Sequence, residues 1–224
     1  MAGSVFNPDN KFFGFMGKIF DVVVLSLVWL ITAIPFPVTF IPATCALYYT
    51  VVKNVRKERG YLLKEYFRSF KLNFKYGMFY SLIFSVFGFL LFYIDFGYAK
   101  DLTEQGSQYG SMFLGVFIII ALFFFSLLVF LPAVLSRFTG KFTFYFKTSF
   151  FMATRHFITS LLLIIIWGVA CLGVYIIPAL MLFLPALAML LSSFLIERVF
   201  KKYMPKKEEA DEKNPDEDHW YLDL

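Results

Sequence analysis

Four basic residues recur at helical spacing in the segment "GYLLKEYFRSFKLNFK", residues 60–75. Lys64, Arg68, Lys71 and Lys75 are separated by four, three and four positions, so on a helix they stack on one face. The other face is largely apolar and aromatic, with Leu62, Leu63, Tyr66, Phe70 and Phe74. Such a helix lies in the membrane interface, with its cations among anionic headgroup phosphates. The segment therefore predicts binding to lipid phosphates or, alternatively, a docking platform for a cytoplasmic protein.

A second segment, "GKFTFYFKTSFFMATR" at residues 140–155, is similar to the first. A shift of about 80 residues aligns Gly60 with Gly140 and Ser69 with Ser149; it also pairs Phe70 with Phe150, Tyr66 with Phe146 and Lys75 with Arg155. We interpret the match as an internal repeat, with coincidence as the alternative. The second copy has fewer cations and more rings, so we expect it to pack deeper against the rest of the protein.

The candidate contacts to a partner or to lipid headgroups are the cations in and next to these two segments: Arg56, Arg59, Lys64, Arg68, Lys71, Lys75, Arg137 and Arg155. The alternative for each of them is an exposed side chain that snorkels to the headgroup level.

Asp21 is the candidate intramembrane polar residue. A charged side chain in mid-bilayer costs about 2.5 to 3.5 kcal/mol on insertion scales, and such residues mark functional sites. Asp21 lies one turn into the first apolar stretch, three residues after Lys18. We expect a local Lys18–Asp21 ion pair near the interface.

Motifs for catalysis are missing from the sequence. It contains no glycine-rich phosphate loop, cysteine cluster or nucleophile elbow. His156 and His219 are far apart, and Cys45 and Cys171 lie in apolar segments, where a thiol behaves as a small hydrophobe. We predict that the protein is not an enzyme and binds no metal or cofactor, and we expect no nucleic-acid partner.

The composition defines the elements that carry these residues. The chain is 59% hydrophobic and 17% charged, with a mean hydropathy of +0.70, which is typical of a polytopic membrane protein. We predict an all-α membrane bundle with two interfacial amphipathic helices on the cytoplasmic face. Apolar windows, free of charged residues except for Asp21 in the first, give six spans, at residues 19–35, 39–52, 76–94, 111–136, 157–176 and 179–196.

Proline positions qualify the number of spans. Pro178 divides the apolar window 157–196 into two helices. The window 39–52 is short, and Pro35, Pro37 and Pro42 precede or interrupt it. It could form a re-entrant or tilted helix instead of a full span, so five spans is the alternative.

The distribution of Lys and Arg predicts the orientation. Cations collect in the loops that follow the second and fourth spans, whereas the loop 97–110 holds one lysine, so the two basic loops should be cytoplasmic. Both termini are then cytoplasmic, in a multi-pass protein of the plasma membrane. We divide the chain into a membrane domain, 1–200, and a disordered acidic cytoplasmic tail, 201–224.

Three stretches together resemble one known family. "NPDNKFFGFMGKIFDVVVLSLVWLITAIP", "ALYYTVVKNVRKERGYLLKEYFRSFKLNF" and "LPAVLSRFTGKFTFYFKTSFFMATRH" are similar, in order and spacing, to the YesL-like family of Gram-positive bacterial membrane proteins, a domain of unknown function. The likeness extends to about Phe200. It departs at Pro42, Ala43 and Thr44, where a glycine-led turn is expected.

The resemblance implies a role but no catalytic residue. Members of that family are often encoded beside ABC importers of carbohydrates and beside glycoside hydrolases, which implies a non-catalytic accessory or scaffold in oligosaccharide uptake. The implied partners are an importer permease, ATPase or solute-binding protein. A stand-alone transporter and a divergent permease subunit are the alternatives, although the "EAA" loop of permeases is missing. Homo-oligomers are a further option.

Overall fold

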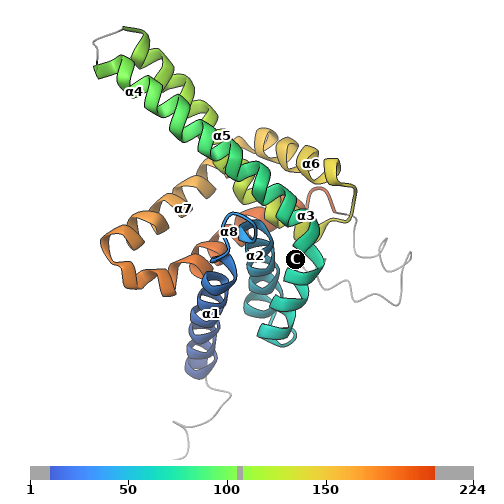
Figure 1. The fold of residues 1–224 in the computed structure, drawn as a ribbon. Helices are drawn as coiled ribbons and strands as arrows, with labels where there is room; N and C mark the ends of the chain where they lie inside the picture. Colours follow the sequence, from blue (N-terminus) through green and yellow to red (C-terminus); the bar gives the residue numbers. More distant parts are fainter. Residues whose placement is uncertain (1–10, 105–107, 205–224) are drawn as a thin grey trace, which may run out of the picture.

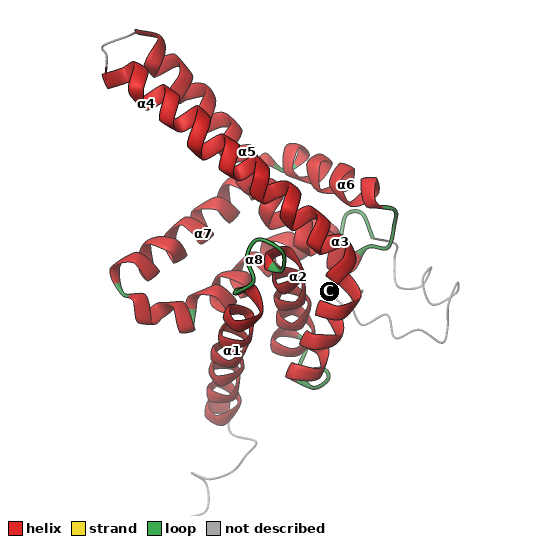
Figure 2. Cartoon of the chain, viewed as in Figure 1, coloured by secondary structure: helices red, strands yellow, loops and turns green. Residues whose placement is uncertain are grey.

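The computed structural model describes residues 11–104 and 108–204, which fold into helices without any strand. The α-helices are α1 (Lys11–Ala33), α2 (Phe40–Thr50), α3 (Leu62–Leu90), α4 (Gly97–Glu104), α5 (Gln108–Arg137), α6 (Phe142–Arg155), α7 (Phe157–Ile176) and α8 (Leu184–Phe200). The π-helical turns η1 (Val51–Arg56) and η2 (Leu91–Phe96) and the 3-10 helix η3 (Pro178–Leu182) connect them. Figures 1 and 2 show the resulting helical bundle.

Helix α2 is the centre of the bundle. It packs against α1, α3, α5 and α8, and nine of its 11 residues are buried. The approach of α3 is close, because a Cβ atom on Gly77 would lie 2.8 Å from Cγ of Pro42. Small residues at helix contacts allow the backbones to approach in this way. Glycine at position 77 is therefore a packing requirement.

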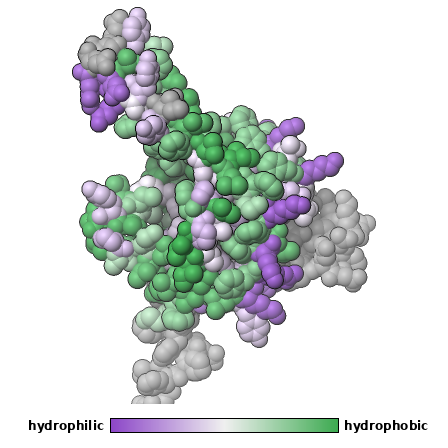
Figure 3. Space-filling view, viewed as in Figure 1, coloured by the Kyte–Doolittle hydropathy of each residue, from purple (hydrophilic) through white to green (hydrophobic). Residues whose placement is uncertain are grey.

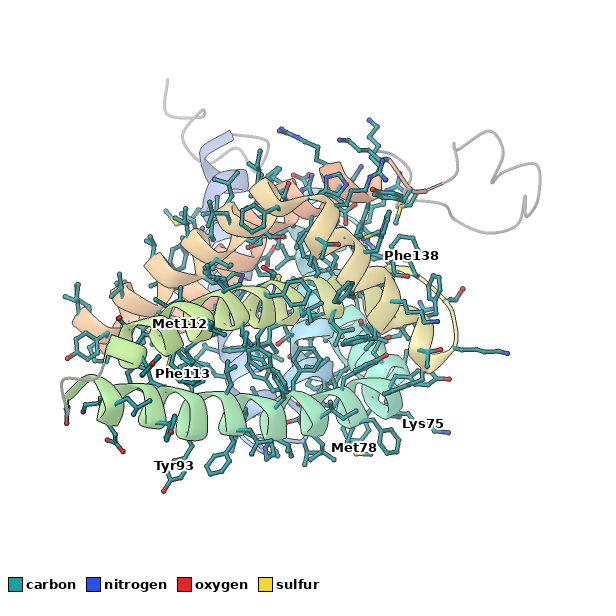
Figure 4. The ribbon with its side chains drawn as sticks, turned by 90° about the horizontal axis from the view of Figure 1, so that it is seen from above. Lys75, Met78, Tyr93, Met112, Phe113 and Phe138 are labelled. Carbon is teal, nitrogen blue, oxygen red and sulfur yellow. The ribbon has the colours of Figure 1, made fainter. Side chains whose placement is uncertain are left out.

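A long hairpin extends from this centre. Helix α3 continues through η2 into α4, and α5 returns beside them, so that the α4 end lies far from α1 and from the start of α3 (Figure 1). Aromatic pairs join the two arms; they are Phe84–Phe124, Phe92–Phe117 and Tyr98–Phe113. In the side-chain view Phe113 lies between the arms and Tyr93 points away from α5 (Figure 4). Ring contacts thus hold the projecting arms together.

Helices α7 and α8 form a second hairpin, and Pro178 begins the 3-10 helix between them. The predicted break at this proline is confirmed. Ser26 of α1 fixes the start of α8, because its hydroxyl donates to the carbonyl of Phe183 at 3.2 Å and accepts from the amide of Ala186 at 3.1 Å. A side chain of α1 thereby satisfies backbone groups at a helix start.

Among the residues that the structure describes, four helices are long and apolar enough to cross a membrane. They comprise Met16–Ala33, Leu62–Tyr93, Tyr109–Arg137 and Phe157–Ile176, which agree with the first, third, fourth and fifth predicted spans. The other two predicted spans correspond to α2, with 11 residues, and α8, with 17. Several apolar helices are compatible with a membrane protein, whereas the counts of six or five spans stay predictions.

The two predicted amphipathic segments differ in the structure. Residues 60–75 do not form a separate helix, because α3 runs without interruption from Leu62 to Leu90. The second segment is a helix of its own, α6, which ends where the backbone of His156 leaves the helical region (φ −111°, ψ 50°). No proline or backbone break separates Lys75 from the apolar part of α3, so the helix simply continues.

The repeat has mixed support. Ser69 and Ser149, which the shift of 80 residues aligns, are both buried. Tyr66 is buried, however, while the aligned Phe146 is 41% exposed. Other exposed rings of α6 are Phe144, Phe150 and Phe151, whereas Tyr145, Ser149, Met152 and Ala153 are buried. That α6 packs deeper than the first segment stays a prediction. The internal repeat itself remains a prediction.

Candidate functional site

A buried ion pair joins α5 to α8. The guanidinium of Arg137 donates through Nε, at 3.0 Å, and through Nη2, at 2.5 Å, to Oε1 of Glu197. Both side chains are only 2% exposed. The hydroxyl of Tyr48, on α2, donates to the same oxygen at 2.6 Å. Three helices thus converge on one carboxylate, and the pair costs much less to bury than either charge alone.

Arg56 lies next to this pair at the end of η1. Its Nη1 donates to the carbonyl of Ser193 at 3.2 Å, and its guanidinium lies over the ring of Phe194 at 4.2 Å. Burial lowers the pKa of Arg56 from its ordinary value, and the negative charge of Glu197 opposes that shift. Arg56 therefore fastens η1 to α8 through a hydrogen bond and a cation–π contact.

A second, less buried pair joins η1 to α3. Lys53 Nζ lies 3.0 Å from Oε2 of Glu65, and the two side chains are 13% and 11% exposed. The turn between them needs Gly60, whose φ of +83° is in the left-handed region. Asn54 is buried beside this turn, and within the described part of the chain neither of its amide atoms has a hydrogen-bond partner.

Asp21 does not form the ion pair that we expected. Lys18 instead contacts Glu58, in the turn before α3, with 2.6 Å between Nζ and Oε1. That hydrogen bond and the charge of Lys18 lower the pKa of Glu58 from its ordinary value. The prediction of a local Lys18–Asp21 pair is wrong because the fold brings Glu58 within reach of α1.

The four periodic cations of α3 stay on its outer face. Lys64, Arg68, Lys71 and Lys75 are exposed, and Figure 4 shows Lys75 on the side of α3 away from α5. The inner face is fixed by Tyr66, whose hydroxyl lies 2.6 Å from that of Thr32 on α1. Hydrophilic side chains gather over the start of α3, over α6 and at the tip of the long hairpin (Figure 3).

The remaining predicted contact residues also include both exposed and buried cations. Arg59 is exposed, and Arg155 is exposed with its guanidinium 5.6 Å from the ring centre of Phe151. Of the eight predicted contact residues, Arg137 is buried and Arg56 partly buried at Glu197, whereas the other six lie on the surface. Of these eight residues, the fold therefore brings together only Arg56 and Arg137, and neither of them is a fully exposed cation.

A groove of about 850 Å³ opens between α1 and α8. Its wall includes the apolar residues Ile19, Val22, Leu187, Leu190 and Phe194, and its rim includes the cations Lys18, Arg56, Lys57, Arg198 and Lys201. Glu197 also lines it. The groove can hold a molecule with an apolar part.

Within residues 11–104 and 108–204, no cluster of three or more His, Cys, Asp or Glu residues that could hold a metal ion occurs. His156 Nε2 lies 3.0 Å from the hydroxyl of Tyr203. Burial and the positive charges of Lys202 and Arg155 lower the pKa of this histidine. His219 and the acidic tail from residue 205 on lie outside the described residues.

Sequence reasoning missed Glu197 and Tyr48. Glu197 was assigned to the polar stretch after the last predicted span, which we ended at Ile196. A signal was present, because apolar residues continue at Val199 and Phe200 and both are buried. A carboxylate inside an apolar run of this kind indicates a buried partner.

Comparison with known protein families gives one match. The sequence model of a family described as "Protein of unknown function, DUF624" matches residues 22–96, from α1 to the end of η2. The matched part includes α2, Arg56 and the exposed cations of α3, but it ends before Arg137 and Glu197. The comparisons with curated proteins and with solved structures found no match.

Proposed function

We propose that the protein is a non-catalytic integral membrane accessory or scaffold that acts beside an ABC-type importer of oligosaccharides. The observation that supports the scaffold role is the exposed row Lys64, Arg68, Lys71 and Lys75 on α3. The link to carbohydrate import rests on the resemblance to the YesL-like family. The family match, to a family of unknown function, is compatible with this proposal and carries no activity of its own.

The four exposed cations lie on a helix that is firmly packed against its neighbours. Tyr66 bonds to Thr32 and, at 3.3 Å, to the carbonyl of Ala43, and Ser81 accepts from the amide of Ile41 at 3.3 Å. Helix α3 is thereby tied to α1 and α2 along its inner face. A binding surface on a rigid element keeps its geometry. A charged, rigid face of this kind suits an acidic surface of an importer ATPase or permease.

The test is purification from the native membrane in a mild detergent, with mass spectrometry of the proteins that remain at a fixed ratio. We expect importer permease or ATPase subunits. The variant Lys64→Glu/Arg68→Glu/Lys71→Glu/Lys75→Glu should lose them while remaining folded. Lys100→Glu/Lys141→Glu/Lys147→Glu/Lys202→Glu is the matched control, since these four cations are also exposed, are not among the predicted contacts, and give an equal change in net charge.

Stand-alone transport is the second candidate function, and the buried Arg137–Glu197 pair favours it, because transporters use buried ionisable pairs on their substrate or ion paths. A chain that purifies alone, or only as a homo-oligomer, should then move a sugar in liposomes without other proteins. Uptake that Glu197→Gln abolishes would support transport. Uptake of no sugar by the folded protein would remove this candidate.

A further inference from the structure

A second pocket, of about 390 Å³, lies between α1, η1 and the start of α3. Its polar lining consists of Lys18 and Asp21 from α1, Asn54 from η1 and Glu58 from the turn before α3. We call it the Asp21–Asn54 pocket. Lys18 and Asp21 lie in the first turns of the apolar window Met16–Ala33, and the end of an apolar span lies near the headgroups of a bilayer. The volume suits a small ligand or one headgroup.

The side chain of Asn54 has no role within the fold itself. Asn54 is 7% exposed, and neither its Oδ1 nor its Nδ2 has a hydrogen-bond partner in the described part of the chain. Backbone bonds close the neighbouring turn, because the amide of Glu58 donates to the carbonyl of Asn54 at 3.0 Å and that of Arg59 to the carbonyl of Lys53 at 3.1 Å. Buried amides are nearly always paired, so Asn54 indicates a polar ligand in the pocket.

Asp21 is the other unpaired group of the pocket. Within residues 11–104 and 108–204 its carboxylate, which is only partly exposed, forms neither an ion pair nor a hydrogen bond. Lys18 and Glu58 neutralise each other at 2.6 Å. Lys57 and Arg59, which flank Glu58, have contacts of their own and do not line the pocket. The lining therefore keeps one unbalanced negative charge, which favours a positively charged ligand.

The backbone beside the pocket has uncommon conformations. Asn54 belongs to η1, a π-helical segment of six residues, and π-helical turns are frequent at functional sites. Glu58 has a φ of +55°, in the left-handed region that residues other than glycine rarely adopt. Residues in such conformations cluster at ligand-binding sites. These features agree with a binding role for the pocket.

The unpaired atoms define the chemistry of the ligand. The carboxylate of Asp21 only accepts hydrogen bonds, whereas the amide of Asn54 has one group that accepts and one that donates. A bare metal ion would leave the donor of Asn54 unpaired, and the ammonium of Lys18 would repel it. A primary ammonium can donate to both Asp21 and Oδ1 of Asn54, while an oxygen next to it accepts from Nδ2.

We propose that the Asp21–Asn54 pocket binds a primary ammonium group with an oxygen acceptor beside it, with Asp21 as the counter-ion. Two sources carry this chemistry, the headgroup of phosphatidylethanolamine and a free amino alcohol such as ethanolamine. The pocket does not include the exposed cations of α3, so the proposal does not rest on the accessory function.

The test uses the full-length protein, stripped of lipid in a mild detergent and examined by native mass spectrometry. The probes are phosphatidylethanolamine, phosphatidylcholine with the same acyl chains, and ethanolamine. The nitrogen of phosphatidylcholine is charged but has no N–H group. We expect phosphatidylethanolamine to bind at least about tenfold more tightly than phosphatidylcholine, because hydrogen bonds to a charged group contribute at least that factor. Equal binding of the two lipids, or binding of neither lipid and no ethanolamine, would overturn the proposal.

Competition distinguishes the two sources. Ethanolamine that displaces bound phosphatidylethanolamine, or that binds when the lipid does not, would support the site and identify a soluble amine as its ligand. A phosphatidylethanolamine that millimolar ethanolamine does not displace would support the site and identify the lipid headgroup.

Two variants locate the site. Asp21→Asn removes the counter-ion at nearly constant size and should weaken binding of the preferred probe at least about tenfold. Asp101→Asn, at an exposed carboxylate outside the pocket, is the matched control and should bind normally. Unchanged binding in Asp21→Asn, with the fold confirmed by circular dichroism, would refute the proposal.

Asn54→Leu separates ligand binding from a structural role of the amide. It should weaken the same probe, and the melting temperature of the lipid-free protein should not fall, because the amide has no partner in the fold to lose. A lowered melting temperature with unchanged binding would show that the amide serves the fold, through water, and would overturn its assignment to a ligand. If this variant does not fold, Asp21→Asn decides.

Discussion

Arg56 and Arg137, the cations next to Glu197, occur in a similar sequence context to the cations on the outer face of α3. Like Lys64 and Lys75, they lie close to apolar stretches, and all of them were predicted as contacts for a partner or for lipid. In the structure Arg137 is 2% exposed and bonded to Glu197, while the α3 row is exposed. The difference shows that a cation at a span end can fasten helices together or face outward, depending on whether the fold supplies a carboxylate.

The largest effect on stability is expected for the substitution Arg137→Met. It leaves the carboxylate of Glu197 buried without its counter-ion, and breaking a buried pair costs about 3 to 5 kcal/mol. We expect that loss in the free energy of unfolding, measured by denaturant titration in detergent micelles. The double variant Arg137→Met/Glu197→Leu should regain most of it, and Arg155→Met, at an exposed cation, is the control. An undiminished stability of Arg137→Met would contradict the structural role.

An intermediate effect is expected for Glu65→Gln. The Lys53–Glu65 pair is more exposed than Arg137–Glu197, so water compensates part of the lost interaction. We expect about 1 to 3 kcal/mol of destabilisation, the range for leaving a buried group unsatisfied, in the same titration. A loss of unfolding free energy as large as that of Arg137→Met would show that the exposed fractions of the two ion pairs do not determine how much each pair stabilises the protein.

A much smaller effect on stability is expected on the outer face of α3. Replacing Lys64, Arg68, Lys71 and Lys75 by Gln should change the unfolding free energy by at most about 0.5 kcal/mol at each position, as for surface substitutions in general. Thermal unfolding in detergent, compared with Lys100→Gln, measures this. A cooperative loss of stability in the quadruple variant would mean that the row holds the fold and is not a free platform.

The smallest expected effect is a pH dependence from His156. Its pKa in the folded protein is lowered by burial and by neighbouring cations, so the unfolded state binds the proton more readily. Stability should be complete above the ordinary pKa of about 6.5 and should fall as the pH drops through it. Comparing the melting temperature at pH 7.5 and 5.5 with that of His156→Gln tests this. Equal slopes in both proteins would remove His156 as the source.

Several elements of the fold were predictable because they depend on local sequence. The first, third, fourth and fifth apolar windows became long apolar helices, and Pro178 ended α7 where its ring predicted a break. The course of residues 60–75 was less predictable. Helical spacing identified the exposed face of the segment, but it did not show that the segment would continue into the following apolar stretch as one helix, α3.

The candidate site was only half predictable. Cation clusters are visible in the sequence, so Arg56 and Arg137 were found. Glu197 was missed because it lies 60 residues from Arg137 and 149 from Tyr48, and one sequence gives no sign of such pairings. Lys18 was assigned to Asp21 for the same reason, since its partner Glu58 approaches only after α1 and η1 have packed.

The sequence by itself determined that the chain forms long apolar helices, which are compatible with a membrane protein, because composition and runs of about 20 apolar residues are properties of the local chain. It also determined where cations gather. Only the tertiary structure decided that α2 is enclosed by its neighbours, that Arg137 is neutralised by Glu197 while the α3 row is exposed, and that a groove opens between α1 and α8. Burial and ion pairing depend on residues that are distant in sequence, so they are settled by packing alone.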